Sequence, residues 1–258
     1  MMAVGTSGYS YRDWKGVFYP ETLKTEGYLS YYAEHFPAVE INSTYYGIPK
    51  LGTFKRMVER TPEGFEFIIK ANSVTTHELS DRTVNRAFQD ALAPLADAGR
   101  LKGVLVQFPW RFRNEEANRR YLAELRKSYD DMPLFIEFRH NSWNCEEVYD
   151  YLSDLNLHYV SVDEPQIGEM MPPVARVTGG IGYVRFHGRN AANWWGKGGD
   201  RYDYLYSEDE LTEWIDRVEQ LEKSTWKLYA FFNNCHHGYA VRNALMFREL
   251  MKKQGRLV

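Results

Sequence analysis

Short apolar runs alternate along the chain with longer stretches of helical period. Eight of these runs are rich in Val, Ile, Phe and Tyr and have the length of strands. Several are apolar on both faces, which is typical of parallel strands buried beneath helices. The eight predicted strands are Val4–Ser7, Val39–Asn42, Phe65–Ala71, Gly103–Phe108, Leu134–Arg139, Tyr159–Asp163, Tyr183–His187 and Leu228–Asn233.

Between the predicted strands, apolar residues recur at the i, i+3, i+4, i+7 spacing of a helix, as at Leu29, Tyr32, Ala33 and Phe36. Similar faces lie within residues 84–95, 121–129, 148–155, 211–218 and 241–245. We expect at least seven helices in strict alternation with the strands. Such alternation predicts a barrel or a doubly wound sheet, and a count of eight strands favours an α/β (β/α)₈ TIM-type barrel.

Two connections depart from this alternation. Residues Glu164–Gly180 contain three prolines and two adjacent glycines, so an irregular loop is expected to replace the helix after the sixth strand. The long connection Gly188–Ser207 is rich in aromatic residues, and loops longer than about 12–15 residues are usually functional or disordered. Its aromatic residues favour a functional loop. No repeat or linker interrupts the pattern, so residues 1–258 are predicted to form a single domain.

Composition restricts the class of protein. The 32 Lys and Arg residues and 35 Asp and Glu residues leave a net charge of -3, so no overall basic field attracts nucleic acid. Nucleic acid is therefore a disfavoured but not an excluded partner. No apolar run approaches the roughly 18 residues of a membrane span, and the first residues lack the features of a signal peptide. The two cysteines have no metal-type spacing, so we expect a cytoplasmic protein with reduced thiols. The oligomeric state stays open.

Nearly every predicted strand becomes polar at its C-terminal end. Side chains two residues apart on a strand point to the same face. Three pairs are therefore expected to face the barrel interior: Glu40 with Asn42, Glu137 with Arg139, and Arg185 with His187. Taken singly, each residue could have a structural role, for example as a buried ion pair or a core histidine. Because buried charges are costly unless paired or liganded, so many at one end of the barrel indicate a functional pocket.

The charges predict that this pocket binds a small anionic ligand. Lysine and the planar arginine fork suit phosphate or carboxylate groups. Gly188 and Gly238 lie where barrels commonly hold phosphate at a helix N-terminus. The predicted binding residues are Lys70, Arg139, Arg185, Asn42, Gln107, Asn233, Asn234, Trp143 and Tyr45. Loop aromatics expected to stack on a sugar or a base are Tyr9, Trp14, Tyr45, Trp110, Trp143 and Trp194. A phosphorylated or acidic compound that is sugar-like or nucleotide-like fits these features.

Several well-defined motifs are absent. The chain has no Walker A loop, no Rossmann glycine fingerprint and no His-Glu-x-x-His segment. Many barrel glycosidases carry acids after strands four and seven, where this chain has Gln107 and His187. Retaining glycoside hydrolysis is therefore disfavoured.

The strand-end segments resemble those of the DUF72 (YecE-like) family. The similar segments are Val39-Glu40-Ile41-Asn42-Ser43-Thr44-Tyr45-Tyr46, Gln107-Phe108-Pro109, Ile136-Glu137-Phe138-Arg139-His140 with Ser142-Trp143, Ser161-Val162-Asp163-Glu164-Pro165, Tyr183-Val184-Arg185-Phe186-His187-Gly188, Arg201-Tyr202-Asp203-Tyr204-Leu205-Tyr206, and Phe232-Asn233-Asn234 with Gly238. They run in order over nearly the whole chain. The resemblance implies a TIM-type barrel in a cytoplasmic protein and supplies no reaction.

Three functional hypotheses follow. The first is an enzyme acting on a small anionic substrate without a cofactor, with Glu137, Glu40, Asp163 and His187 as its acid and base candidates. The second is a metal-dependent isomerase-like or phosphodiesterase-like barrel in which the same four side chains hold a divalent metal ion. Three nearby cations count against that site. The third is a non-catalytic protein that binds a ligand or nucleic acid through its aromatic residues.

Overall fold

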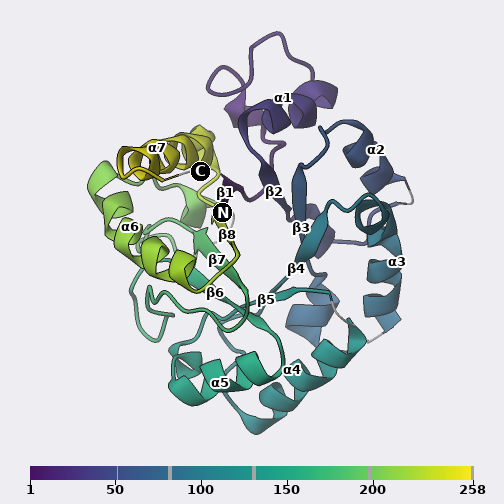
Figure 1. Cartoon of the computed structure of the whole chain (residues 1–258), viewed down its shortest axis with the longest axis vertical. Helices are drawn as coiled ribbons and strands as arrows, with labels where there is room; N and C mark the ends of the chain where they lie inside the picture. The colour runs from purple at the N-terminus through teal and green to yellow at the C-terminus, as the bar shows by residue number, and fades with distance from the viewer. Residues whose placement is uncertain (51, 81–82, 130–131, 197–198, 257–258) are drawn as a thin grey trace.

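The structure is a computed structural model that describes residues 1–50, 52–80, 83–129, 132–196 and 199–256. Eight parallel strands pair in the order β1-β8-β7-β6-β5-β4-β3-β2 and form a nearly closed barrel (Figure 1). The predicted TIM-type barrel is confirmed. The strands are β1 (Met2–Thr6), β2 (Ala38–Ile41), β3 (Glu66–Lys70), β4 (Leu101–Gln107), β5 (Leu134–Glu137), β6 (His158–Asp163), β7 (Ile181–Phe186) and β8 (Lys227–Phe232).

The barrel closes between β1 and β2 through a tyrosine hydroxyl rather than a full ladder. A single bridge joins Ser7 to Glu40. Below it, the Tyr32 hydroxyl accepts the Thr6 N–H at 2.8 Å and donates to the Ala38 carbonyl at 3.1 Å. Tyr32 is fully buried. Its hydroxyl therefore satisfies backbone groups that a direct strand pair would otherwise join.

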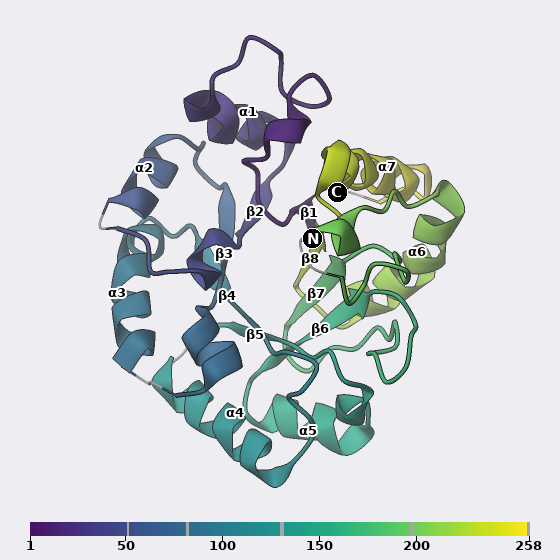
Figure 2. The ribbon, with the colours of Figure 1, turned by 180° about the vertical axis from the view of Figure 1, so that it is seen from behind.

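The helices lie outside the ring of strands, as the view from behind also shows (Figure 2). Within the described ranges there are seven α-helices. They are α1 (Tyr28–His35), α2 (Thr53–Glu59), α3 (Thr83–Asp97), α4 (Glu116–Ser128), α5 (Glu146–Asp154), α6 (Glu208–Lys223) and α7 (Tyr239–Lys253). The connection from β6 to β7 contains no helix, which confirms the expected irregular loop. None of the described helices is long and apolar enough to cross a bilayer.

Aromatic side chains fill much of the space between strands and helices. Phe138 stacks on Trp143 with ring centroids 4.2 Å apart, and Phe108 stacks on Phe112 at 3.9 Å. The Trp143 indole is fully buried and donates its N–H to the Phe112 carbonyl at 2.7 Å. Buried tryptophans usually need such a partner for the indole nitrogen. This layer fixes the segment that follows β5, which carries Arg139 into the barrel mouth.

Candidate functional site

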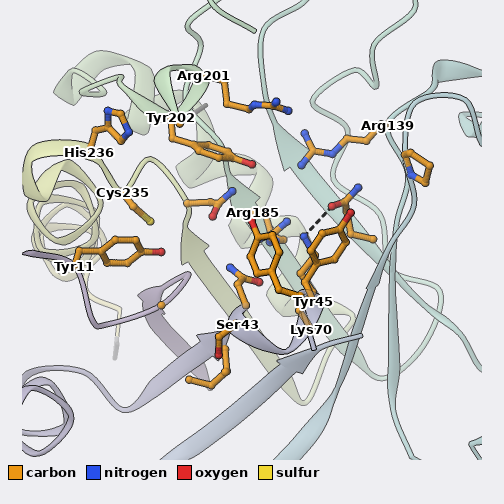
Figure 3. A pocket seen from close by; sticks show the side chains of 18 of the residues that line it. Tyr11, Ser43, Tyr45, Lys70, Arg139, Arg185, Arg201, Tyr202, Cys235 and His236 are labelled. Carbon is orange, nitrogen blue, oxygen red and sulfur yellow. Dashed lines mark hydrogen bonds between the residues drawn. The ribbon is translucent and has the colours of Figure 1, made fainter. Parts of the chain in front are cut away.

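A pocket of about 1010 Å³ lies over the C-terminal ends of the strands (Figure 3). This volume is at the upper end of the range for small-molecule sites, about 300–1,000 Å³. Seven of the predicted binding residues line it: Asn42, Tyr45, Lys70, Gln107, Arg139, Arg185 and Asn233. Each lies at or just after the end of a strand, and together they come from six different strands. The barrel, rather than any local segment, assembles this pocket.

Arg185 is the most constrained cation of the pocket. Its Nε and Nη2 donate to the two carboxylate oxygens of Glu40 at 2.9 and 2.6 Å. Its Nη1 donates to Glu137 Oε2 at 2.6 Å. Glu40 also accepts hydrogen bonds from the Tyr183 hydroxyl at 2.5 Å and the Asn42 amide at 3.0 Å. Both carboxylates are fully buried and Arg185 is only 1% exposed, so this is a buried ion-pair network with satisfied partners.

Arg139 extends the same network along the mouth of the barrel. Its Nη2 lies 2.8 Å from Glu137 Oε1, and its Nη1 pairs with Glu164. The His187 Nε2 lies 3.2 Å from the same Glu137 oxygen, and its Nδ1 lies 3.0 Å from the Asn233 amide nitrogen. The pairs Glu137 with Arg139 and Arg185 with His187 thus share one face, as strand alternation predicts.

The protonation states in this network follow from burial and neighbouring charge. Burial alone would raise the pKa of Glu137, but Arg185 and Arg139 outweigh it and hold the pKa well below its ordinary value. Burial raises the pKa of Glu164 to about 8, although Arg139 opposes the shift. Burial and Arg139 hold the pKa of His187 well below its ordinary value. Near neutral pH, Glu137 is therefore ionised, while Glu164 and His187 are neutral.

Lys70 differs from the two arginines because it has no acidic partner. In the part of the chain that the structure describes, no carboxylate lies within ion-pair distance of its ammonium group. Its Nζ donates to Gln107 Oε1 at 2.9 Å and lies 4.8 Å from the centre of the Tyr45 ring. Burial, assisted by the charge of Arg185, lowers the pKa of Lys70 to about 7. We call Lys70, Arg139 and Arg185 the cationic cluster.

Aromatic and basic residues from several loops form the rim of the pocket. The guanidinium of Arg139 lies over the Trp194 ring at 5.6 Å, and Trp110 contacts Trp195 in an edge-on arrangement. Sequence reasoning missed four basic rim residues: His77, Arg111, Arg201 and His236. They lie in the connections between strands and α-helices, in turns or in helices of three to five residues, where no periodic pattern marks a position. Two signals pointed to Arg201: the length of connection 188–207, and its place in the family-like segment of residues 201–206.

Asp163, predicted to share the pocket, lies in a separate network on the outside of the barrel. Its carboxylate accepts hydrogen bonds from Arg189 at 2.9 and 2.8 Å, from the Tyr206 hydroxyl at 2.6 Å and from the Trp214 indole at 2.6 Å. Because these four donors satisfy the Asp163 carboxylate, its role is structural. Glu40, Glu137 and His187 are brought together without it, so the four side chains proposed to hold a metal ion do not converge.

Glu164 is the acid that faces the barrel mouth from this segment. In the parallel pairing of β6 with β7, Val162 lies beside Arg185, and Asp163 lies beside Phe186. Val162 therefore shares the inward face of Arg185, and Asp163 shares the outward face of Phe186. Glu164, two residues beyond Val162, continues the inward face. Strict alternation across Ser161-Val162-Asp163-Glu164 was the signal that could have found it.

Three other residues predicted for the site pack or form hydrogen bonds inside the protein instead of facing the pocket. Trp143 lies in the aromatic layer described above. Trp14 is fully buried and donates its indole N–H to the Cys235 carbonyl at 2.8 Å. Asn234 donates to the Tyr204 carbonyl and to Asn243, both at 2.8 Å. None of the three lines the pocket.

An eight-stranded TIM-type barrel with a strand-end cationic pocket defines the class of this protein, and the chain belongs to the DUF72 family. The family profile described as "Protein of unknown function DUF72" matches residues 3–258. The chain is similar to the UPF0759 protein YunF of Bacillus subtilis (strain 168), with 33% identity over 271 residues covering 97% of this chain and 95% of that protein. The family resemblance of the strand-end segments is thereby confirmed.

Solved structures of two DUF72 family proteins have the same fold. The protein from Thermotoga maritima MSB8 is 41% identical, with a TM-score of 0.91 covering 98% of this chain and 99% of that chain. The protein from Enterococcus faecalis V583 is 30% identical, with a TM-score of 0.87 covering 98% and 96%.

Proposed function

We propose that this protein is an enzyme acting on a small anionic substrate, phosphorylated or acidic and sugar-like or nucleotide-like, in the strand-end pocket. The observation that carries the proposal is an asymmetry of charge. All three members of the cationic cluster line the pocket, whereas Glu40 and Glu137 lie fully buried behind the arginines and do not line it. An entering ligand therefore meets the positive ends of these pairs, which favours an anion.

Lys70 is the best candidate for proton transfer. A general acid or base works most efficiently when its pKa lies near the working pH, and burial lowers the pKa of Lys70 to about 7. Glu137, predicted from sequence as the acid or base, stays ionised and is held by two arginines. Its proposed role is to position Arg185 and Arg139. Glu40 positions Arg185 in the same way.

The aromatic residues of the rim favour a ligand in which a sugar or a base is attached to the anionic group. Tyr45 lies beside Lys70, and Trp194 lies beside Arg139, so aromatic rings flank the cationic cluster on two sides. Aromatic faces stack on sugar rings and bases. Inorganic phosphate alone would fill a small part of a pocket of about 1010 Å³.

Thermal denaturation in the presence of phosphate, sugar phosphates and nucleoside monophosphates tests anion binding. A ligand that binds only the folded state stabilises it by mass action, by about 2.7 kcal/mol at a hundredfold excess over Kd. We expect Arg139→Met and Lys70→Met to lose most of this stabilisation. Lys127→Met, on an exposed face of α4, should respond as the parent does. Equal responses of parent and Arg139→Met, against chloride at matched ionic strength, would contradict the proposed binding site.

Turnover is tested with the ligands that bind. Incubation with the parent protein, followed by phosphorus NMR, should show conversion that Lys70→Met abolishes. Conversion at the parent rate by Lys70→Met would contradict the role of Lys70. Absence of conversion for every ligand that binds would favour a non-catalytic binding protein.

A further inference from the structure

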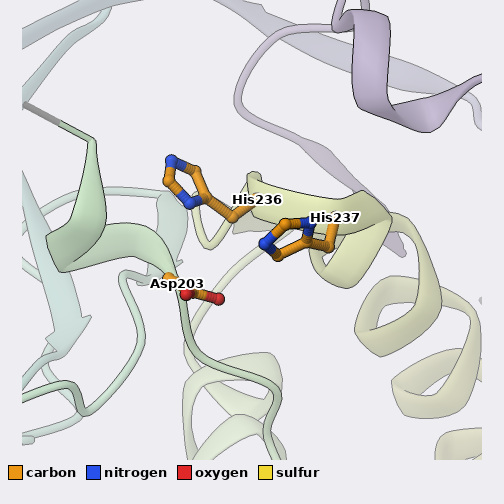
Figure 4. A group of neighbouring side chains, drawn as sticks. All are labelled: Asp203, His236 and His237. Carbon is orange, nitrogen blue, oxygen red and sulfur yellow. The ribbon is translucent and has the colours of Figure 1, made fainter.

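Two histidines and an aspartate gather at the edge of the pocket, outside the cationic cluster. They are Asp203, which follows the short helix at Asp200–Tyr202, and His236 and His237, which follow β8. One carboxylate oxygen and one nitrogen from each ring lie within 4.8 Å of one another. Figure 4 shows the three side chains around a common space. We propose that these three residues form a binding site for Zn²⁺ at the pocket edge.

The three side chains have no competing partners within the described ranges. No hydrogen bond or ion pair joins the Asp203 carboxylate or either imidazole to another side chain there. This contrasts with Glu40 and Glu137, whose carboxylates are satisfied by arginines. Side chains that converge without pairing keep their lone pairs available for a cation.

The backbone around the cluster is built to hold the two histidines in place. His237 has φ of 53°, in the left-handed region that few residues other than glycine adopt and in which Asn, Asp and His are the most frequent exceptions. The Asp13 carboxylate accepts the His237 N–H and fixes this turn. At Gly199, a Cβ atom would lie 2.6 Å from His236 Nε2, so glycine there leaves room for the ring.

The donor set suits Zn²⁺. Two imidazoles and one carboxylate, with remaining positions open, make up the ligand set of many zinc sites that also bind water or substrate. Ligands about 2.0–2.1 Å from a tetrahedral Zn²⁺ lie roughly 3.4 Å apart, so the three groups need to close by about 1.4 Å at most. Asp203 and His237 are exposed, which leaves their side chains free to make this adjustment.

The site borders the proposed substrate pocket without depending on it. His236 lines the pocket and lies near Tyr202 in Figure 3. A zinc ion on His236 would place an open coordination position at that edge, where an anionic group of a ligand could bind it. Zinc binding itself requires only the three ligands, so it can be tested separately from anion binding.

Isothermal titration calorimetry of tag-free, chelator-treated protein with Zn²⁺ tests the proposal. We expect one ion per chain in the parent. His237→Asn and Asp203→Asn should each weaken binding at least tenfold. Asparagine tolerates the left-handed conformation at position 237, so the variant should fold, and the melting temperature without metal checks this.

Two control variants separate this site from other zinc ligands. Glu169→Gln removes one carboxylate charge, as Asp203→Asn does, but at a different histidine–carboxylate pair. There, His140 Nε2 lies 3.3 Å from Glu169 Oε2. Cys145→Ser removes the partly exposed thiol. Both should bind Zn²⁺ as the parent does. A parent Kd weaker than about 1 mM, unchanged affinity in His237→Asn, or affinity lost in either control would overturn the proposal.

Discussion

Arg185 joins two fully buried carboxylates, and its place in the pocket depends on both. The sequence marks Arg185 as a ligand-binding residue, and a residue with that role alone could be replaced without loss of the fold. The structure indicates a larger effect, because removing the guanidinium leaves Glu40 and Glu137 in the barrel interior with fewer partners. Arg139 is the safer position for testing anion binding, because Glu164 is largely neutral and Glu137, its other partner, keeps the ion pair with Arg185.

Arg185→Met is therefore expected to lower the free energy of unfolding by about 3–5 kcal/mol, the usual cost of breaking a buried ion pair from one side. Urea denaturation monitored by circular dichroism measures this. Adding Glu40→Gln to the variant should recover part of the loss, because it removes one of the unpaired charges. A single variant within about 0.5 kcal/mol of the parent, the range of ordinary surface substitutions, would contradict this reasoning.

The lowered pKa of Lys70 predicts a pH dependence of anion binding. Lys70 is cationic below about pH 7 and becomes neutral above it. Sulfate affinity, measured by calorimetry between pH 6 and 9 because sulfate keeps its charge over this range, should fall as the pH rises through about 7. Lys70→Met should bind more weakly at pH 6 and lack this decrease.

Glu164 titrates in a neighbouring pH range, since its pKa is raised to about 8, and its ionisation would also disfavour an anion. Glu164→Gln removes that contribution. It should keep the decrease that begins near pH 7. If the decrease vanishes in Glu164→Gln and persists in Lys70→Met, the assignment to Lys70 is wrong.

At the scale of elements, the junction of β1 and β2 depends on a side chain from α1. Tyr32→Phe removes the hydroxyl that accepts the Thr6 N–H and donates to Ala38. An unsatisfied buried polar group costs about 1–3 kcal/mol, so we expect a loss of stability of that size in urea denaturation.

The neighbouring Tyr31 provides the matched control, because its side chain is only partly buried and its hydroxyl makes no hydrogen bond with the described residues. Tyr31→Phe should change the stability by less than about 0.5 kcal/mol. Amide hydrogen exchange at Thr6 should also accelerate in Tyr32→Phe. Equal stability of the two variants would show that the hydroxyl does not hold the junction.

At the scale of the whole molecule, periodicity predicts the barrel because each strand and most helices carry a local signal. The short helix α2, of seven residues, has too few turns for a clear apolar face, and the sequence predicts no range for it. The alternation of side chains along a strand correctly predicts that Glu40 shares a face with Asn42 and that Arg185 shares a face with His187. Continued past the end of β6, the same alternation places Glu164, and not Asp163, on the inward face.

The rim could not be predicted in the same way. Arg201 and His236 come from short helices in the connections after β7 and β8, whose positions depend on the folded barrel, so neighbours in space are far apart in sequence. The same holds for Asp203 with His236 and His237. Local sequence patterns thus predict the cationic cluster at the strand ends, whereas the rim residues can be identified only in the folded structure.

The buried pairing of Arg185 has a consequence for the entropy of binding. Immobilising an arginine side chain costs about 2 kcal/mol of conformational entropy. Glu40 and Glu137 already hold this guanidinium in one orientation, so that loss occurs when the barrel folds and not when a ligand arrives. Arg185 is thus preorganised, and a ligand must match its position rather than reshape it. Adaptation to the rest of the ligand is left to the more exposed rim, where Trp195 is 63% exposed.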